Sequence, residues 1–259
     1  MSNPPKVSVV TSVYNGEKYI EDCVQSILSQ SFRDFEYIVL NNGSTDGTAE
    51  LLDKFDDPRL KIVHQENLGI SRSLNKGIDM ACSELIARLD ADDVSSPDRL
   101  EIQVRFMESN PEFVLCAGGY NKWKDGEISP QTVPLPCSDA EIRSCLSDYN
   151  PIAHSAAMFR KEAFNKVGGY DRRLDFSQDY DLWIKLMKTG KACNLQDVLG
   201  FVRFYEVSTL SKNKNNTFFE AVKVKRRAYC FHGGSFFNLL FFVVRGFSVL
   251  ICRNVFQLK

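Results

Sequence analysis

The sequence lacks the residue spacing of the common cysteine and histidine sites. Its 8 Cys residues are scattered, no two of them form a C-x-x-C pair, and only 3 His residues are present. Zinc sites and disulfide frameworks depend on clustered ligands or on dense, regularly spaced cysteines. We therefore expect neither, and interpret the cysteines as reduced thiols of a cytosolic protein.

Several other motifs are missing. The N-terminus has no basic segment leading into a long apolar stretch, so no secretory signal is expected. No G-x-S-x-G nucleophile elbow, no G-x-x-x-x-G-K-[ST] phosphate loop and no G-x-G-x-x-G fingerprint occurs. These absences argue against a serine hydrolase, a P-loop enzyme and a dinucleotide-binding enzyme.

Acidic residues are absent from the C-terminal end. No Asp or Glu follows Glu220, whereas seven Lys and Arg residues do. The first 220 residues therefore contain 25 basic and 33 acidic residues, a net charge of −8, and the last 39 residues carry +7. The overall charge of −1 hides this asymmetry, which indicates a surface-binding end.

The same end is rich in aromatic residues, with 7 of the 19 Phe residues in the final 29 positions. Arg245 and Gly246 interrupt the apolar stretch from Phe236 to Phe256. A membrane-spanning helix needs about 20 mainly apolar residues and disfavours a central Arg. We expect helices that lie on the inner leaflet of the cytoplasmic membrane, with basic residues near 223–227 attracting anionic lipid. Packing on the body or in a dimer interface is the alternative.

Short apolar runs alternate with helical patterns over the first 120 residues. This β-α alternation predicts an α/β fold with a parallel sheet covered by helices on both faces. The expected strands are Val7–Tyr14, Phe35–Leu40, Leu60–His64 and Leu85–Leu89, and the expected helices are Tyr19–Leu28, about 48–55 and about 71–80. No Gly/Pro/Ser-rich linker divides the chain, so we expect one domain over 1–215, with a regular half over about 1–120 and a less regular half over about 121–215, followed by a tail over 216–259.

Polar segments follow three of the predicted strands, at the edge where ligands bind in sheets of this type. Asp90-Ala91-Asp92-Asp93 places three carboxylates within four positions, and they repel one another unless a cation lies between them. Mg²⁺ or Mn²⁺ takes one or two such carboxylates and completes its shell with water and phosphate. An acidic loop that caps the next helix is the alternative. The other two segments are Tyr14-Asn15-Gly16 and Asn41-Asn42-Gly43-Ser44-Thr45-Asp46.

A further pair of acids lies just ahead of the helical run Leu182–Met187. Asp179 and Asp181 either complement the helix dipole or, in the case of Asp179, project into the site as a general base. His154, in Ala153-His154-Ser155, either is structural or lines the site.

Taken together, these residues resemble the family 2 glycosyltransferases with the GT-A fold. The resemblance rests on the order of the motifs and covers roughly residues 5–210. Along the chain these are Val7-Ser8-Val9-Val10 with Tyr14-Asn15, Ser26 to Phe32, Phe35 to Val39 with Asn42-Gly43-Ser44-Thr45-Asp46, Asn67-x-Gly69, Asn75-x-Gly77-Ile78, Asp90-Ala91-Asp92-Asp93 with Pro97-Asp98-Arg99-Leu100, Gly168-Gly169-Tyr170-Asp171, and Asp179 to Trp183.

The resemblance implies a mainly parallel, Rossmann-like nucleotide-binding sheet, here followed by hydrophobic C-terminal helices. It further implies that the half over about 1–120 binds the nucleotide sugar and that the half over about 121–215 holds the acceptor and the catalytic residue. It also implies inverting transfer of a hexose from a nucleoside-diphosphate sugar, with UDP the first choice, to a saccharide hydroxyl. The tail suggests a lipid-linked acceptor and a role in bacterial surface-polysaccharide assembly. We expect no nucleic-acid partner. A non-catalytic nucleotide-sugar-binding or scaffold protein on the same fold is the alternative.

Residue roles follow from the resemblance alone. Asp92 would ligate Mn²⁺ or Mg²⁺, and Asp90 would contact the metal, the ribose or a metal-bound phosphate. Asp179, at the position of the family's catalytic acid residue, would take the proton from the acceptor hydroxyl. The nucleotide-sugar pocket would comprise Ser12, Tyr14, Asn41, Asn42 and Arg72, with Arg72 directed at the diphosphate.

Two positions depart from the family pattern. The family usually has carboxylates where this chain has Asn41 and Asn42, and one of them accepts from the imide N–H of uracil. An amide oxygen can also accept that bond, but the amide NH₂ can donate as well. The family's Arg-x-His pattern near the phosphates is Arg203-Phe204-Tyr205 in this chain.

Overall fold

The computed structural model describes residues 4–124, 127–204, 214–233 and 240–244. Its strands are β1 (Val7–Val13), β2 (Phe35–Asn42), β3 (Leu60–Gln65), β4 (Leu85–Arg88), β5 (Val94–Ser95), β6 (Phe113–Lys124), β7 (Glu127–Thr132), β8 (Met158–Arg160) and β9 (Lys191–Arg203). Its helices are α1 (Ile20–Leu28), α2 (Thr48–Leu52), α3 (Ile70–Met80), α4 (Arg99–Ser109), α5 (Asp139–Cys145), the 3-10 turn η1 (His154–Ala156), α6 (Lys161–Lys166), α7 (Gln178–Leu186) and α9 (Lys214–His232).

Strands β3, β2, β1 and β4 lie side by side and parallel, as the sequence predicts. All seven residues of β1 are buried, because helices cover both faces of this part of the sheet. Val9 packs in the same cluster as Ile20 of α1 and Leu100 of α4, whereas Val10 packs with Leu74 of α3 on the opposite face. This alternation with period two explains why β1 is buried along its whole length.

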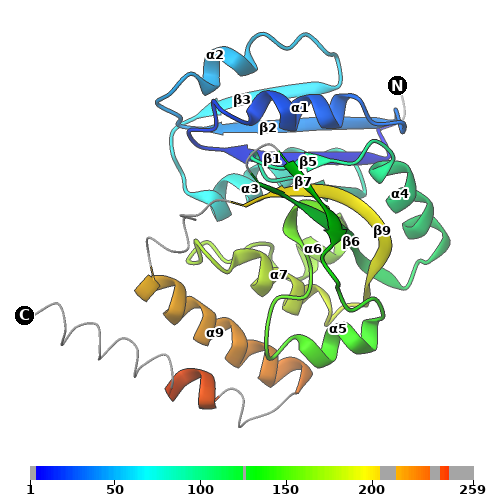
Figure 1. Cartoon of the computed structure of the whole chain (residues 1–259), viewed down its shortest axis with the longest axis vertical. Helices are drawn as coiled ribbons and strands as arrows, with labels where there is room; N and C mark the ends of the chain where they lie inside the picture. The colour runs from blue at the N-terminus through cyan, green and yellow to red at the C-terminus, as the bar shows by residue number, and fades with distance from the viewer. Residues whose placement is uncertain (1–3, 125–126, 205–213, 234–239, 245–259) are drawn as a thin grey trace, which may run out of the picture.

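The remaining strands make the sheet mixed. β8 lies antiparallel between β4 and β6, β9 is parallel to β6, and β5 is antiparallel to β9. The long strands β6 and β9 curve across the middle of the molecule, below the parallel part (Figure 1). The predicted α/β fold is confirmed, and the second half is more regular than its sequence indicates.

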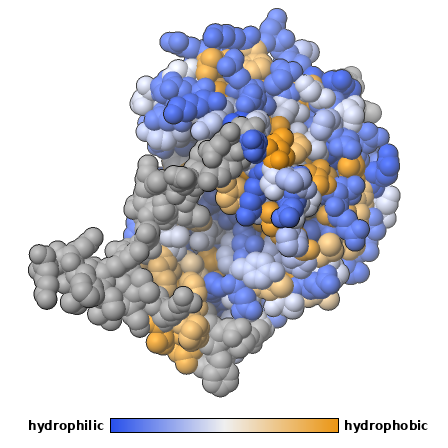
Figure 2. Space-filling view, in the orientation of Figure 1, coloured by the Kyte–Doolittle hydropathy of each residue, from blue (hydrophilic) through white to orange (hydrophobic). Residues whose placement is uncertain are grey.

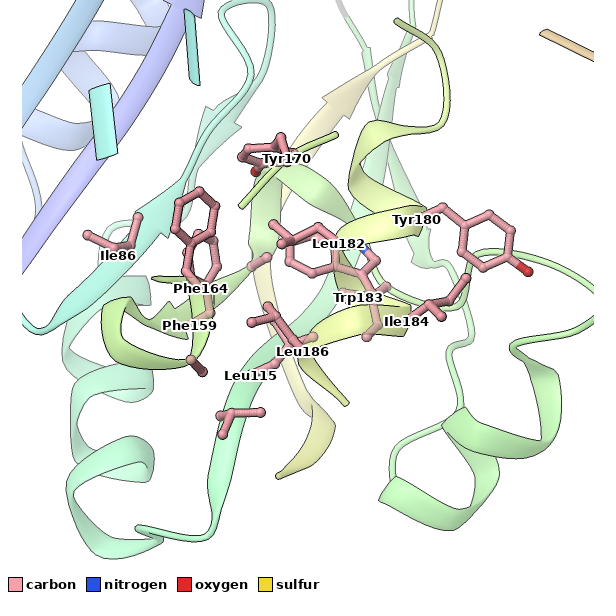
Figure 3. Close-up of a cluster of buried hydrophobic side chains, with 14 of the residues drawn as sticks. Ile86, Leu115, Phe159, Phe164, Tyr170, Tyr180, Leu182, Trp183, Ile184 and Leu186 are labelled. Carbon is pink, nitrogen blue, oxygen red and sulfur yellow. The ribbon is translucent and has the colours of Figure 1, made fainter. Parts of the chain in front are cut away.

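A large apolar core in the second half holds α7 against the sheet. Trp183 of α7 is fully buried, and its ring lies 6.1 Å from that of Phe159 on β8. Phe159 in turn stacks on Phe164 of α6, with ring centroids 5.5 Å apart. Figure 3 shows these rings gathered with Leu182 and Leu186 of α7. The packing fixes the direction of α7, whose first turn carries the predicted base.

The first part of the predicted tail is packed on the body. Helix α9 lies against α7, and its residues Val224 and Ala228 are fully buried in the same core. Residues 240–244 are helical, and the rest of the stretch from Phe236 to Phe256 lies outside the described residues. Within the described ranges, no helix is long and apolar enough to cross a membrane. The hydrophobic C-terminal helices therefore stay a prediction.

Candidate active site

The carboxyl ends of β1, β2 and β4 bring the predicted polar segments to one edge of the sheet. In the ladder Val13 of β1 is opposite Asn41 of β2, and Val10 of β1 is opposite Arg88 of β4. Ser12, near the end of β1, is buried, and its hydroxyl donates to Ser73 Oγ of α3 at 2.8 Å. The three strand ends therefore lie at one edge of the sheet, as expected, and Ser12 joins this edge to the start of α3.

The two Asn side chains at the end of β2 have different bonding. Asn42 Oδ1 accepts from both Gln65 Nε2 and Leu68 N, each at 2.9 Å, so its oxygen is fully used in shaping the adjacent loop. Asn41 Oδ1 accepts only from Ser44 N at 3.2 Å among the described residues. A carbonyl oxygen has two lone pairs, so Asn41 keeps one with which to accept from a nucleobase.

The loop after β1 is locked to the loop after β2. Asn15 has a left-handed φ of 53°, and its side-chain oxygen accepts from Thr45 N at 2.8 Å. Its own backbone N–H donates to Ser44 Oγ at 3.0 Å. Tyr14, the residue before Asn15, is 54% exposed at the edge of the sheet, where a base or ribose can pack on it.

Arg72 lies in the first turn of α3, one position before Ser73. Its side chain is exposed and forms no hydrogen bond or ion pair with any residue that the structure describes. The structure therefore places Arg72 beside the site edge without bonding it to the other predicted site residues.

Asp90 is held by three side chains. Its Oδ1 accepts from Arg88 at 2.8 Å and lies 3.2 Å from His154 Nδ1, and its Oδ2 accepts from Ser155 Oγ at 2.9 Å. Burial alone would raise the pKa of Asp90, but its contacts with His154, Arg88 and Ser155 outweigh burial and hold that pKa below the usual range. Asp90 is therefore an ionised carboxylate whose position is held by these contacts.

Asp93 is the third acid of this loop, and it contacts the backbone of β9. Its Oδ1 accepts from the backbone N–H of Arg203 at 2.9 Å, and its Oδ2 contacts Ser155 Oγ. Burial, together with the nearby charges of Asp92 and Asp90, raises the pKa of Asp93 well above its usual value. Asp93 thus joins the acidic loop to β9, and Asp90 and Asp92 are the two carboxylates predicted to bind a cation.

These two carboxylates fit a divalent metal that completes its shell with substrate. The described residues contain no group of three or more His, Cys, Asp or Glu side chains arranged to hold a metal ion by themselves. Mg²⁺ and Mn²⁺ typically take one or two protein carboxylates, with water and substrate phosphates as the other ligands.

Asp179 lies in the first turn of α7, and Asn150 Nδ2 donates to its Oδ2 at 2.8 Å. Burial raises the pKa of Asp179, and the charge of Asp90 adds to this rise, while His154 and Asn150 act in the opposite direction. The net shift is upward, as expected for a carboxylate that serves as a base. The charge of Asp90 acts on the Asp179 carboxyl, so the two acids lie near each other.

Three residues of the candidate site had no role predicted from sequence: Arg88, Ser155 and Tyr170. Arg88 is fully buried and donates to His154 Nε2 at 3.1 Å, and Tyr170 Oη lies 2.9 Å from the same nitrogen. A charged residue inside an otherwise apolar strand was the available signal for Arg88. His154, for which a structural and a site-lining interpretation were both open, contacts Asp90 directly.

The second departure from the family pattern begins at Arg203. The Arg203 guanidinium lies 4.0 Å from the centre of the Trp123 ring and donates to Asp22 of α1 at 2.5 Å. It therefore binds the body rather than pointing freely at a phosphate. Tyr205 lies outside the described residues.

Comparisons with known sequences identify the family. The model of glycosyl transferase family 2 matches residues 8–168. The chain is 32% identical over 230 residues to the putative glycosyltransferase EpsE of Bacillus subtilis, covering 84% of this chain and 79% of EpsE. It is also 32% identical over 207 residues to the amylovoran biosynthesis glycosyltransferase AmsE of Erwinia amylovora, covering 76% of this chain and 75% of AmsE.

Solved structures show the same fold. The S. aureus TarS fragment 1–349 in complex with UDP-GlcNAc has a TM-score of 0.72 at 20% identity, covering 94% of this chain and 73% of that one. The mannosyltransferase PcManGT of Pyrobaculum calidifontis, in complex with GDP-Man and Mn²⁺, has a TM-score of 0.65 at 17% identity, covering 100% and 82%. The chain therefore belongs to glycosyl transferase family 2 and is a glycosyltransferase with the GT-A fold, related to enzymes of polysaccharide biosynthesis.

Proposed function

We propose that this glycosyltransferase moves a hexose from a UDP-sugar to a hydroxyl of a lipid-linked saccharide, with inversion, in the assembly of a bacterial surface polysaccharide. The observation that carries the proposal is the meeting of Ser12, Asn41 and Asp90 at one sheet edge, with Asp179 within electrostatic reach of Asp90. Two relatives named above support it, since AmsE is named for polysaccharide biosynthesis and TarS binds UDP-GlcNAc.

Each residue has a distinct role in the proposed reaction. Tyr14 and Asn41 hold the nucleoside, and Arg72 attracts the diphosphate. Asp92, assisted by Asp90, holds Mn²⁺ or Mg²⁺, which when bound stabilises the negative charge that develops on the departing diphosphate.

The acceptor hydroxyl loses its proton to a carboxylate oxygen of Asp179 as it attacks the anomeric carbon. The attack comes from the face opposite the diphosphate, so the new bond has inverted configuration. Asn150 and the packing of α7 keep Asp179 directed at this position.

We propose that the enzyme works at the inner face of the cytoplasmic membrane, as a peripheral protein. The +7 charge of the last 39 residues supports this location, as do exposed side chains near the C-terminal end such as Phe231 (43% exposed) and Phe241 (67% exposed). A basic surface interleaved with aromatic residues is typical of proteins that lie on anionic bilayers.

The test measures release of the nucleoside diphosphate from a panel of UDP- and GDP-sugars with Mn²⁺, with and without a chelator. We expect a UDP-sugar to be the substrate and the chelator to abolish turnover. Asp92→Ala should lose metal-dependent turnover, and Asp179→Asn should lose turnover while a donor still raises the melting temperature. The exposed Asp98 gives the matched control Asp98→Asn, which should react normally. Full turnover by either Asp92→Ala or Asp179→Asn would refute the assigned roles.

A further inference from the structure

A hollow of about 970 Å³ opens on the second half of the molecule. The end of α6, the Gly168–Arg173 loop, the end of α7 and the side of α9 line it. None of the residues assigned above to donor binding, metal binding or proton transfer lines this hollow, although Tyr170, which contacts His154, does.

The lining of the hollow is strongly basic, with six cations and one acid. The acid, Asp171, is already neutralised, because Arg173 binds both of its oxygens at 2.9 Å and Lys223 and Arg227 also approach it. The six cations are Lys166, Arg172, Arg173, Lys185, Lys188 and Arg227.

Three of these cations contact an acidic side chain, and the other three form no ion pair with a described residue. Lys185 and Arg227 both bind Asp181, which is fully buried behind the lining. Lys166, Arg172 and Lys188 are exposed and form no ion pair with any residue in the described ranges. Three neighbouring positive charges without acids favour an anionic ligand, because bringing them together otherwise costs repulsion.

The hollow also has an apolar side. Phe231 forms part of its wall, and the ammonium of Lys188 lies 3.7 Å from the centre of the Phe231 ring. Phe231 is 43% exposed, and the side chains of Leu240 and Val244 beyond it are 46% and 56% exposed. Figure 2 shows apolar atoms gathered at the lower left, where Figure 1 places α9 and residues 240–244. Cations beside exposed apolar side chains match the boundary between headgroups and acyl chains of a bilayer.

We propose that this basic hollow holds the phosphate groups of anionic lipids and so docks the folded body on a bilayer surface. The inference rests on the membrane location given under Proposed function, and it places part of that contact on the globular body. Phosphate oxygens accept from Lys166, Arg172 and Lys188, while Phe231 faces the acyl boundary.

The experiment measures flotation of the full-length protein with vesicles of phosphatidylcholine alone and vesicles that also contain phosphatidylglycerol. The test variant combines Lys166→Gln, Arg172→Gln and Lys188→Gln, which removes the three cations that have no ion pair. The control variant combines Lys54→Gln, Lys61→Gln and Lys76→Gln, three exposed cations of the nucleotide-binding half. Melting temperatures of both variants check that the fold is retained.

We expect wild-type protein and control variant to bind only the vesicles with phosphatidylglycerol, and the test variant to bind them about 100-fold more weakly. Unchanged binding by the test variant would overturn the inference and leave membrane association to other parts of the chain. No binding by the wild-type protein would overturn both. Binding of inorganic pyrophosphate, measured by calorimetry, without vesicle binding would identify a soluble anion as the ligand and overturn the lipid assignment.

Discussion

At the scale of single residues, His154 connects the acidic loop to the second half of the molecule. Arg88 donates to His154 Nε2, and a guanidinium can only donate, so this nitrogen must accept. The proton of the neutral ring is then on Nδ1, which faces Asp90 at 3.2 Å. Tyr170 Oη, 2.9 Å from Nε2, holds the ring from the other side. His154 therefore acts as a positioning residue for Asp90.

This arrangement predicts different effects for two substitutions of His154. His154→Leu removes the donor to Asp90 and should raise the Mn²⁺ concentration for half-maximal turnover by about 10- to 100-fold, the usual effect of losing a residue that orients a metal ligand. His154→Asn keeps an N–H near the place of Nδ1 and should recover part of this loss. Metal titrations of the initial rate check both. Equal defects in the two variants would mean that the ring serves packing alone.

The upward shift in the pKa of Asp179 predicts the pH dependence of the reaction. A base must be ionised, so kcat/KM should fall as the pH drops through the raised pKa, at a higher pH than an ordinary Asp would give. The hydrogen bond from Asn150 favours the carboxylate, so Asn150→Ala should move this acidic limb to still higher pH. A rate profile across pH measures the shift.

Asn165, exposed on α6, supplies the control, and Asn165→Ala should keep the wild-type profile. An acidic limb that does not move in Asn150→Ala would contradict the assignment of Asp179 as the base.

Some site residues were predictable from sequence and others were not. Asn41 lies at the end of β2, and Asp92 lies just beyond the end of β4. Their place at the sheet edge therefore follows from strand direction alone. Arg88 was missed because only the folded structure provides its acceptors, which are backbone oxygens of Val10 and Leu89 and the side chains of Asp90 and His154. Long-range partners of this kind leave no local pattern.

At the scale of elements, the turn between β2 and α2 depends on close packing against the loop after β3. Gly43 has φ +77°, and a Cβ there would lie 2.6 Å from the backbone nitrogen of Asn67. Asn67 and Asn42 also bond to each other across this contact, at 3.4 Å. The glycine therefore allows two loops of the donor pocket to touch.

Two glycine substitutions separate the strain of the turn from its packing. Gly43→Ala introduces both a positive φ and a clash, whereas Gly168→Ala, at φ +78°, has no atom within 4 Å of the new Cβ. Both should lose about 1–2 kcal/mol of unfolding free energy to backbone strain, and Gly43→Ala should lose a further 1–3 kcal/mol to overpacking. Urea denaturation measures the difference. Equal losses would show that the loop moves aside without cost.

The same scale shows which elements can be read from sequence. The parallel strands were predictable because β1 and β2 are rich in apolar residues, as strands buried on both faces are. β8 was not, since it has only three residues, Met158–Arg160, and pairs antiparallel with β4 and β6 through the tertiary fold. A strand of that length is too short for a period-two pattern to emerge.

At the scale of the whole molecule, the acidic body and the basic end are joined by α9. Arg227 of α9 binds the buried Asp181, and His232, its last residue, lies 2.8 Å from the Ile184 carbonyl and 3.0 Å from Arg143. The helix is thus attached to the body along its length. Any separation of body from tail must therefore come after Gly233.

Truncation after Gly233 tests this division. It keeps the buried contacts of α9 and the basic hollow but removes Arg245, Arg253, Lys259 and most of the C-terminal Phe residues. We expect binding to anionic vesicles to fall at least 100-fold, because about 1 kcal/mol is lost for each basic residue near the surface, together with the apolar contacts. The thermal shift caused by donor and Mn²⁺ should stay unchanged, since the residues assigned to donor binding all precede Gly233. Vesicle binding at the wild-type level, with a change from dimer to monomer by light scattering, would instead identify the tail as a subunit interface.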